Sequence, residues 1–458
     1  MHLPKTPNRG INEHQTSRIN RKTGPEARSP LPQLLVSDGS GHVFEIPELL
    51  MTGSGFLDPV VPSKDELIPL PYGSDLFELP DRVAIGYDPA TEQYVEVHTY
   101  KGKPVYPVAA FMAPAYLQLY RSAYLTPEGA VRLPLYCYTA VGWMNGTFYV
   151  PAMRIDPDRR QDLELFDLKE IEKRAVERLK QFKGNRLVYH LVENCTLTYG
   201  CPAARNFVLG RWECPVPTSA ACNAACVGCI SEQPPESGIV ASHERLQFLP
   251  TVDEIVEFTV PHLEKAERAV VSFGQGCEGE PLMAGPLIEE AIRAIRKRTS
   301  RGIININTNA SRPEVVDRLC RAGLDSIRVS MNSAQKHFYE AYYQPRQYGF
   351  EQVIQTMRLM HRHGRWVSIN YLVFPGLTDH PDEIAALSRL IQEVEPDMLQ
   401  TRNLNIDPHW YIEALALHTL SPQQIGMKRW VELMRKRFPR LKLGYFNPPK
   451  EAMQRGEP

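Results

Sequence analysis

The sequence predicts an α/β fold in which a partial or full (β/α) barrel follows a small β-rich N-terminal domain. Two observations carry this prediction. From residue 186 to 446, short apolar runs alternate with amphipathic segments, which is typical of parallel strands joined by crossover helices. From residue 31 to 155, strand-like pieces rich in Val and Tyr recur between turn signals, which favours a half-buried antiparallel sheet.

The alternation in residues 186–446 supplies five or six strand–helix units, enough for a partial or full barrel. The predicted strands are Trp212–Val216, Ala269–Phe273, Ile303–Asn307, Ser326–Ser330, Val367–Val373 and Met398–Thr401. The predicted helices are Leu287–Arg298, Pro313–Ala322, Phe350–His363 and Glu383–Val394. In barrels of this kind, catalytic groups gather at the carboxyl ends of the strands.

The N-terminal half contains five strand-like stretches and one strong turn signal. The predicted strands are His42–Ile46, Arg82–Tyr87, Tyr94–Tyr100, Val105–Met112 and Leu133–Val141. Asn145-Gly146 stands between two apolar runs, which predicts a two-residue β-hairpin. We therefore expect residues 31–155 to form an accessory β domain.

Three more segments complete the predicted organisation. Residues 1–30 are polar and basic with few large apolar side chains, so we expect a disordered basic tail. Residues 156–185 place apolar residues at helical spacing among charges, which predicts a connecting helix. Residues 447–458 are expected to be a C-terminal tail.

Composition sets limits on function. The chain has 458 residues, 43% of them hydrophobic and 23% charged, with a formal net charge of -1. The balance of charges gives no global attraction for nucleic acid, which is therefore not indicated as a partner. No apolar run is long enough to span a membrane, and no secretory signal is recognisable, so we expect a cytoplasmic protein. In that compartment the nine cysteines are better explained as thiolates or metal ligands than as disulfides.

Three cysteines lie close together after the first predicted barrel strand. Cys222, Cys226 and Cys229 are spaced C-x3-C-x2-C, with small residues between them that keep the loop slim. Thiolates suit iron–sulfur clusters, and three of them leave one iron of a [4Fe–4S] cluster with an open position. An open position indicates catalysis rather than structure. A zinc site or buried structural cysteines are the alternatives.

This spacing resembles that of the radical S-adenosylmethionine (SAM) superfamily, and the resemblance extends over roughly residues 212 to 405. It implies a radical SAM barrel in which the three cysteines hold a [4Fe–4S] cluster whose open iron is chelated by SAM. It further implies an enzyme that splits SAM reductively to a 5′-deoxyadenosyl radical, which abstracts hydrogen from a substrate. An electron donor such as flavodoxin or ferredoxin is implied as a partner. The subfamily is not identified.

Further segments resemble the SAM-binding positions of that family. Gly279, Glu280 and Pro281 match the end of its Gly-Gly-Glu-Pro segment, in which the methionine amino group is held. Glu278 stands where the family has the first glycine, so backbone contacts at that position are in doubt. An ordinary strand-to-helix turn with a surface glutamate is the alternative.

The ends of the next three predicted strands supply the remaining candidates. Asn307 ends the third strand, where either a SAM or substrate contact or a helix-capping turn explains the asparagine. Ser330 and Asn332 alternate at the end of the fourth strand, so both side chains are expected on one side, toward SAM. Phe374, after the fifth strand, resembles the position that packs on adenine, although a core strand followed by a turn explains it equally well.

Other cysteines give a second, weaker prediction. Cys195, Cys201 and Cys214, together with Cys277, would supply ligands for a second iron–sulfur cluster of the kind that some family members carry. Buried free cysteines are the alternative, and we prefer that interpretation for Cys137 and Cys320.

The sequence leaves the reaction open. The substrate implied by the resemblance is RNA, a peptide or a small metabolite, and whether SAM is consumed or regenerated is undetermined. Residues after the fourth strand that would suit substrate contact are Tyr339, Tyr342, Tyr343 and Arg346. The competing functions are an iron–sulfur electron-transfer or sensing protein without SAM chemistry and a zinc-stabilised binding module.

Overall fold

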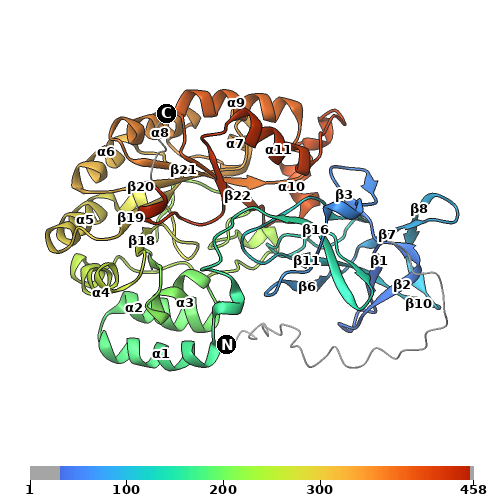
Figure 1. The fold of residues 1–458 in the computed structure, drawn as a ribbon, viewed down its shortest axis with the longest axis horizontal. Coiled ribbons are helices and arrows are strands. Elements are labelled where there is room, and N and C mark those ends of the chain that lie inside the picture. The colour runs from blue at the N-terminus through green and yellow to red at the C-terminus, as the bar shows by residue number, and fades with distance from the viewer. Residues whose placement is uncertain (1–30, 454–458) are drawn as a thin grey trace.

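A seven-stranded parallel sheet forms the centre of the C-terminal part of the computed structural model, which describes residues 31–453 (Figure 1). Its strands follow one another in space as they do in the chain: β17 (Glu213–Val216), β18 (Val270–Phe273), β19 (Ile303–Thr308), β20 (Ser326–Met331), β21 (Trp366–Val373), β22 (Met398–Asn403) and β23 (Lys442–Gly444). Within the described residues, β17 and β23 do not pair with each other, so the barrel is partial. The predicted fold class is confirmed.

Helices surround this sheet, and those that precede it pack beside it on one another (Figure 1). They are α1 (Leu168–Gln181), α2 (Arg186–Tyr189), α3 (Pro202–Leu209), α4 (Val252–Lys265), α5 (Gly285–Arg298), α6 (Pro313–Ala322), α7 (Lys336–Tyr343), α8 (Phe350–Arg362), α9 (Pro381–Val394), α10 (Pro408–Ala414) and α11 (Met427–Arg437). A π-helix, His190–Thr198, follows α2. Short 3-10 turns are η2 (Lys64–Glu66), η3 (Leu163–Leu165), η5 (Pro235–Ser237), η6 (Pro281–Ala284), η7 (Leu417–Thr419) and η8 (Lys450–Ala452).

Local signals explain why α6 has the bounds that the sequence predicts. Pro313 occupies its first turn, where the missing N–H leaves no donor unpaired. Gly323 ends it with φ of 118°, in the left-handed region that favours glycine. Between them, Val316 and Leu319 are fully buried against the sheet. Burying one such side chain contributes about 1.5–3 kcal/mol.

The N-terminal part, residues 31–154, is built from antiparallel strands (Figure 1). They are β1 (Gln33–Ser37), β2 (Val43–Leu50), β3 (Gly53–Ser54), β4 (Pro59–Val60), β5 (Leu67–Pro69), β6 (Asp75–Glu78), β7 (Val83–Asp88), β8 (Gln93–Val97), β9 (Thr99–Tyr100), β10 (Lys103–Pro104), β11 (Tyr106–Phe111), β12 (Tyr116–Gln118), β13 (Arg121–Ser122), β14 (Tyr124–Leu125), β15 (Gly142–Met144) and β16 (Thr147–Arg154). The β-rich character predicted for this region is confirmed.

The predicted hairpin is present and one predicted strand is wrong. Asn145 and Gly146 have φ of 53° and 81° and join β15 to β16, as expected for a type I′ turn. Residues 133–141 form no strand and make only isolated bridges at Thr139. Pro134 lacks an N–H for a ladder, and the Leu133 N–H donates at 2.9 Å to a carboxylate of the barrel, Asp407.

A buried ion pair joins the β-rich region to the barrel. Arg82 Nη2 lies 2.9 Å from Asp407 Oδ2, and the two side chains are 1% and 2% exposed. A second contact comes from the Gln118 N–H, which donates at 3.0 Å to Asn403 Oδ1 at the carboxyl end of β22. The β-rich region therefore packs against the carboxyl ends of the last barrel strands.

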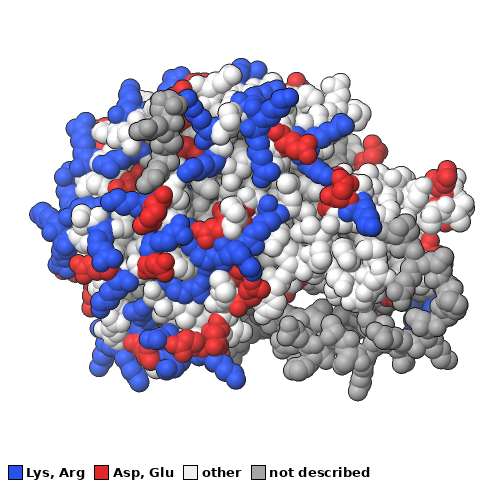
Figure 2. All heavy atoms as spheres, viewed as in Figure 1, with Lys and Arg blue, Asp and Glu red and all other residues white. Residues whose placement is uncertain are grey.

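Acidic and basic side chains are mixed over the surface of the barrel helices. Figure 2 shows Lys and Arg interspersed with Asp and Glu on this face. Among the described residues, no helix combines the length and apolarity needed to cross a membrane.

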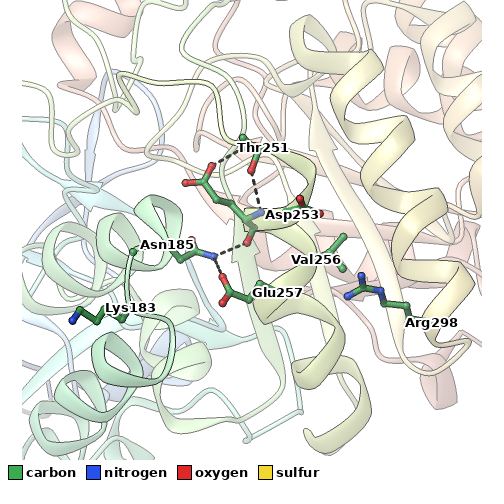
Figure 3. Close-up of a pocket in the computed structure, with 9 residues that line it drawn as sticks. Lys183, Asn185, Thr251, Asp253, Val256, Glu257 and Arg298 are labelled. Atoms are coloured by element: carbon green, nitrogen blue, oxygen red, sulfur yellow. Dashed lines mark hydrogen bonds between the residues drawn. The ribbon is translucent and has the colours of Figure 1, made fainter.

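The N-terminus of α4, a helix that the sequence analysis missed, borders an open pocket of about 460 Å³ (Figure 3). Thr251 and Glu254 form a reciprocal capping box there. Asn185 donates from its side-chain amide to the Glu254 carbonyl oxygen and to the Glu257 carboxylate, at 2.8 Å each. No predicted site residue lines this pocket, and its polar groups serve to cap and join helices.

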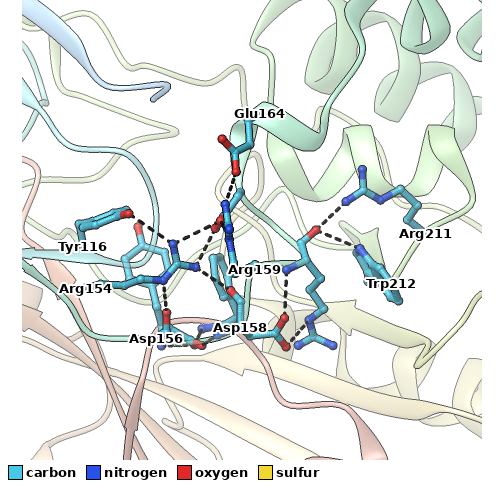
Figure 4. A network of polar contacts seen from close by, with 12 residues as sticks. Tyr116, Arg154, Asp156, Asp158, Arg159, Glu164, Arg211 and Trp212 are labelled. Atoms are coloured by element: carbon cyan, nitrogen blue, oxygen red, sulfur yellow. Dashed lines mark hydrogen bonds and ion pairs between the residues drawn. The ribbon is translucent and has the colours of Figure 1, made fainter. Parts of the chain in front are cut away.

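A polar network fixes the chain where it passes from the β-rich region to the barrel (Figure 4). Arg154, at the end of β16, pairs with Asp162 at 2.8 Å. The Arg160 carbonyl oxygen accepts hydrogen bonds from Arg211 and from Trp212 Nε1, which directly precede β17. Asp156 accepts the backbone N–H of Tyr445 at 2.8 Å, after β23. Both edges of the partial barrel are thus tied to the same connecting segment.

The expected tail at residues 1–30 and residues 454–458 of the expected C-terminal tail lie outside the described residues. Asn447, which belongs to that expected tail, is 5% exposed. Its side-chain amide donates at 3.0 Å to Glu213 on β17 and at 3.2 Å to Ser272 on β18. Contacts with the barrel therefore continue past residue 446.

Candidate metal centre and cofactor site

The cysteine loop follows β17 and is held by the end of α7. The N–H groups of Ala225 and Val227 donate to the carbonyl oxygens of Tyr343 and Tyr342, at 3.0 and 2.9 Å. A β-carbon on Gly228 would lie 2.9 Å from the Tyr342 hydroxyl, so the loop passes close to this ring. Tyr342 and Tyr343 are 3% and 4% exposed and support the loop through their backbone, and substrate contact at their side chains stays a prediction.

The three thiols of this loop, Cys222, Cys226 and Cys229, are half-buried and lie near one another. Burial raises the pKa of Cys222, and it raises the pKa of Cys226 well above its usual value; the charges of Cys222 and Cys229 add to the rise at Cys226. A bound cation would favour the thiolate forms of Cys222 and Cys226.

The spread of the three sulfur atoms bears on the alternative of a zinc site. Around a tetrahedral Zn²⁺ with Zn–S of 2.3 Å, two sulfurs lie about 3.8 Å apart. Among the described residues, one group alone has three ligand atoms all within 4.8 Å of one another, and it is His190, Cys195 and Cys277 rather than the triplet. The triplet therefore fits a larger metal group better than a single ion.

The segment after β18 packs directly on the cysteine loop. The Gly279 N–H donates to the Ser219 carbonyl oxygen at 2.7 Å, and the Glu280 N–H donates to that of Ala221 at 2.9 Å. A β-carbon on Gly279 would lie 2.1 Å from the Ala221 oxygen, which only glycine permits. Glycine at this position is thus required by the contact between the two segments.

The contacts of Glu278 explain why a glutamate stands where the resembled family has the first glycine of its Gly-Gly-Glu-Pro segment. Its buried carboxylate accepts the backbone N–H groups of Thr218 and Ser219, at 2.7 and 2.8 Å, and that of Gln275 at 2.7 Å. Burial raises the pKa of Glu278 to about 8. The side chain therefore fixes the start of the cysteine loop, while its backbone completes the turn.

Glu280 connects this turn to the end of β19. Its carboxylate accepts the backbone N–H groups of Leu282 at 3.0 Å and Asn309 at 2.8 Å, together with the Thr308 hydroxyl. It is 4% exposed, and burial raises its pKa to about 7. A buried carboxyl group whose pKa is raised in this way gains from a cationic partner. It is not the surface glutamate of the alternative interpretation.

The comparison with known protein families identifies the family of the region that contains the cysteine loop. Residues 216–388 match the model of the Radical SAM superfamily, a span that contains the cysteine loop, β18 to β21 and the first half of α9. Residues 216–388 belong to the radical SAM superfamily. Membership implies SAM cleavage with an iron–sulfur cluster and makes the chain an enzyme, while the subfamily stays unspecified. No curated protein sequence matches the chain.

Three solved structures that resemble this chain share little sequence identity with it. Methylornithine synthase is 14% identical with a TM-score of 0.36, over 61% of this chain and 72% of its own. A radical SAM methyltransferase from Sphaerobacter thermophilus is 16% identical with a TM-score of 0.35, over 50% and 66%. Coproporphyrinogen III oxidase from Escherichia coli is 14% identical with a TM-score of 0.30, over 41% and 43%.

The other predicted SAM positions of the radical SAM domain differ in their surroundings. Asn307 donates to the Gly274 carbonyl oxygen at 2.6 Å, and Ser330 lies half-buried on β20. Asn332 lies past the last residue of β20, is fully buried and donates to the Tyr411 hydroxyl at 3.0 Å. The Phe374 ring is buried beneath the Arg121 guanidinium, whose carbon lies 4.5 Å from the ring centre.

Arg245 is a residue at the radical SAM site that the sequence analysis missed. Its guanidinium lies 3.6 Å from Cys229 Sγ and donates to the Ser231 hydroxyl at 3.2 Å. The charge of Arg245 also lowers the pKa of Cys222, against the larger effect of burial. It lies in an irregular loop, so no periodicity or motif could have indicated it.

The interior of the radical SAM barrel contains two arginines. Burial lowers the pKa of Arg328 on β20 to about 9; the charge of Arg402 on β22 lowers it further, and that of Glu213 on β17 opposes the shift. Groups from the first, fourth and sixth strands meet in this way because all three face the lumen. Within the described residues, the buried Nε atoms of both arginines have no hydrogen-bond partner.

The structure brings together some of the cysteines predicted for a second cluster. Cys195 Sγ lies 3.5 Å from Cys277 Sγ, and the Cys201 N–H donates to the Cys195 carbonyl oxygen at 2.8 Å. Cys214 is buried on β17, where the charges acting on its thiol come from Arg178 and Glu213. A second iron–sulfur cluster stays a prediction.

Proposed function

We propose that Cys222, Cys226 and Cys229 bind a [4Fe–4S] cluster and that Gly279, Glu280 and Pro281 bind SAM beside it. The observation that carries this proposal is the direct hydrogen bonding between the cysteine loop and the turn after β18, at 2.7 and 2.9 Å. Because both segments lie at the carboxyl ends of neighbouring parallel strands, a ligand held by one contacts the other.

The residues of the chain have separate parts in this proposal. The three thiols hold the cluster, and the Glu280 carboxylate, whose pKa burial raises to about 7, accepts the cationic amine of SAM. Further SAM contacts are proposed at the ends of the next strands: Asn307, Ser330, Asn332 and Phe374. When bound, a cluster reduced by a donor such as flavodoxin or ferredoxin supplies the electron that splits SAM to methionine and a 5′-deoxyadenosyl radical.

The substrate in this proposal carries an anionic group that binds Arg328 and Arg402. Two guanidinium groups facing one lumen repel each other, and their buried Nε atoms lack partners among the described residues. A carboxylate or phosphate would reduce the repulsion between the two guanidinium groups and accept charge-assisted hydrogen bonds from their Nε atoms. Because the β-rich region covers part of the barrel mouth, a small metabolite suits the lumen better than a large nucleic acid.

A reducing compartment fits this proposal. All nine cysteines are free thiols in the structure. The cytoplasm keeps thiols reduced and is the compartment that we propose.

The test of the proposed function is release of 5′-deoxyadenosine by anaerobically reconstituted, reduced protein supplied with SAM. We expect release from the wild type and none from Cys226→Ala, while Cys320→Ala, which changes a buried thiol beside Met360, retains it. If wild type with a full complement of iron yields none under several reductants, the proposal is wrong.

A panel of metabolites tests the substrate class. We expect carboxylated or phosphorylated compounds to stimulate 5′-deoxyadenosine formation and, when they are deuterated, to transfer deuterium to the 5′-deoxyadenosine. Arg328→Met should raise the concentration required for this stimulation. Stimulation by uncharged compounds alone, at concentrations that the Arg328 change does not alter, would contradict the anionic assignment.

A further inference from the structure

A second group of soft metal ligands lies outside the cysteine triplet. His190 and Cys195 belong to the π-helix His190–Thr198, and Cys277 belongs to the turn after β18. Their ligand atoms all lie within 4.8 Å of one another, and all three residues are buried. π-Helical turns are rare and occur frequently at functional sites, so the segment that carries two of these ligands is itself unusual.

The distances in this group fit one metal ion. Cys195 Sγ and Cys277 Sγ are 3.5 Å apart, close to the separation of about 3.8 Å that two thiolates have around a tetrahedral Zn²⁺. The separation is much longer than the 2.03–2.05 Å of a disulfide bond. The two thiols therefore lie at the spacing of neighbouring ligands of a single ion.

His190 is oriented like a metal ligand. Its Nε2 is buried and, among the described residues, has no hydrogen-bond partner, while its Nδ1 lies 3.1 Å from the side-chain amide of Asn194. With the amide turned by a half rotation, which leaves the heavy atoms in place, Nδ1–H donates to the Asn194 oxygen. This hydrogen bond fixes the ring and leaves Nε2 with a free lone pair, as in most protein metal sites.

The charges of such a site balance. Two thiolates and one neutral imidazole carry a charge of about −2, which a divalent ion cancels. A metal that displaces the two thiol protons leaves a buried group with no net charge, and a neutral fourth ligand such as water would complete the tetrahedron.

We propose that His190, Cys195 and Cys277 bind one divalent metal ion of the zinc class. Imidazole with two thiolates is a ligand set that zinc prefers. The ion would join the π-helix to the turn that contains Glu278 and Gly279, two residues that hold the cysteine loop. The site is separate from the triplet and does not depend on the proposed function.

The test uses the full chain with the triplet replaced, Cys222→Ala, Cys226→Ala and Cys229→Ala, so that the triplet contributes no bound iron. This protein is loaded anaerobically with Zn²⁺, desalted and analysed for metal. We expect one zinc per chain, and a cobalt-loaded sample should show the thiolate-to-metal absorption of a tetrahedral site. Adding Cys195→Ala or the conservative His190→Gln should remove both signals, whereas adding Cys214→Ala should keep them.

Several results would overturn the proposal. They are the absence of bound zinc in the triplet variant, zinc that persists in both the Cys195 and His190 variants, and retention of iron with sulfide at this site. A Cys195–Cys277 disulfide found by mass spectrometry in anaerobically prepared protein would also overturn it. Circular dichroism of His190→Gln shows whether the chain remains folded, and failure of SAM cleavage in the wild type has no bearing on these measurements.

Discussion

Gly279 and Ala221 approach so closely that a β-carbon on Gly279 would lie 2.1 Å from the Ala221 carbonyl oxygen. This contact joins the turn after β18 to the loop of the three cysteines. We expect Gly279→Ala to push the two segments apart. An added methyl group in a packed site costs about 1–3 kcal/mol, so cluster binding should weaken by about tenfold or more.

Iron and sulfide retained per chain after anaerobic reconstitution and desalting measure this effect. Gly55→Ala is the matched control, because its β-carbon would meet only the Tyr120 ring at 3.8 Å. Equal iron retention in Gly279→Ala and Gly55→Ala would show that the close contact does not support the cluster.

The guanidinium of Arg245 lies 3.6 Å from Cys229 Sγ. A positive charge beside a cluster ligand stabilises the reduced cluster, which carries one more negative charge. We therefore expect Arg245→Met to shift the reduction potential of the bound cluster to a more negative value, and Arg245→Lys to shift it less. A redox titration followed by electron paramagnetic resonance measures the shift.

The control for Arg245 is Arg293→Met, which removes an exposed arginine paired with Glu289 on α5. It should leave the potential unchanged. A positive shift in Arg245→Met would contradict the electrostatic argument.

Arg82 and Asp407 form the buried pair that joins the β-rich region to the barrel. Asp407→Asn keeps the shape of the side chain but leaves the Arg82 guanidinium buried without its counter-charge. Breaking a buried pair costs about 3–5 kcal/mol, so we expect a clearly lower melting temperature. Glu351→Gln, which breaks the exposed pair with Lys336, should change the melting temperature little. Indistinguishable melting of the two variants would refute the prediction.

His262 gives the stability of the fold a pH dependence. Burial beneath α3 lowers its pKa from 6.5 to about 4. Below pH 6.5 the unfolded chain binds a proton at this residue and the folded chain does not, so stability falls as the pH drops from 6.5 to about 4. The loss is on the order of 3 kcal/mol.

Urea unfolding at several pH values between 4 and 7 tests this prediction for His262. His262→Gln cannot titrate, so its stability should depend less steeply on pH in this window. The exposed His409→Gln should retain the slope of the wild type. If all three proteins have the same slope, His262 does not titrate as inferred.

Local signals in the sequence were sufficient for part of the fold. Pro313 and Gly323 mark the ends of α6, and Asn145-Gly146 marks the hairpin, because these residues restrict or extend backbone conformation wherever they occur. The strand β23 was missed because its three residues, Lys442–Gly444, are too few to show a pattern. The region 133–141 was misassigned because contacts with the barrel, which no local pattern records, fix its path.

In the candidate site too, local sequence patterns predicted some features and long-range contacts determined the others. The three cysteines of the triplet lie close together in the sequence, so their spacing could be interpreted directly. Cys195 and Cys277 are 82 residues apart, and His190 has no motif around it, so only the folded chain brings this group together. Glu278 was recognised as a departure from the family pattern, but the three amides that it holds, those of Thr218, Ser219 and Gln275, could not be inferred from the sequence.

The Arg82–Asp407 pair has a consequence for how the protein is made. A ribosome synthesises 325 further residues after Arg82 before its partner exists. Until then, the β-rich region has an unneutralised cation on the surface that will face the barrel. Contacts so far apart in sequence slow folding, and exposed, unpaired surfaces promote aggregation during synthesis. The nascent N-terminal region therefore depends on late translation to reach its final state.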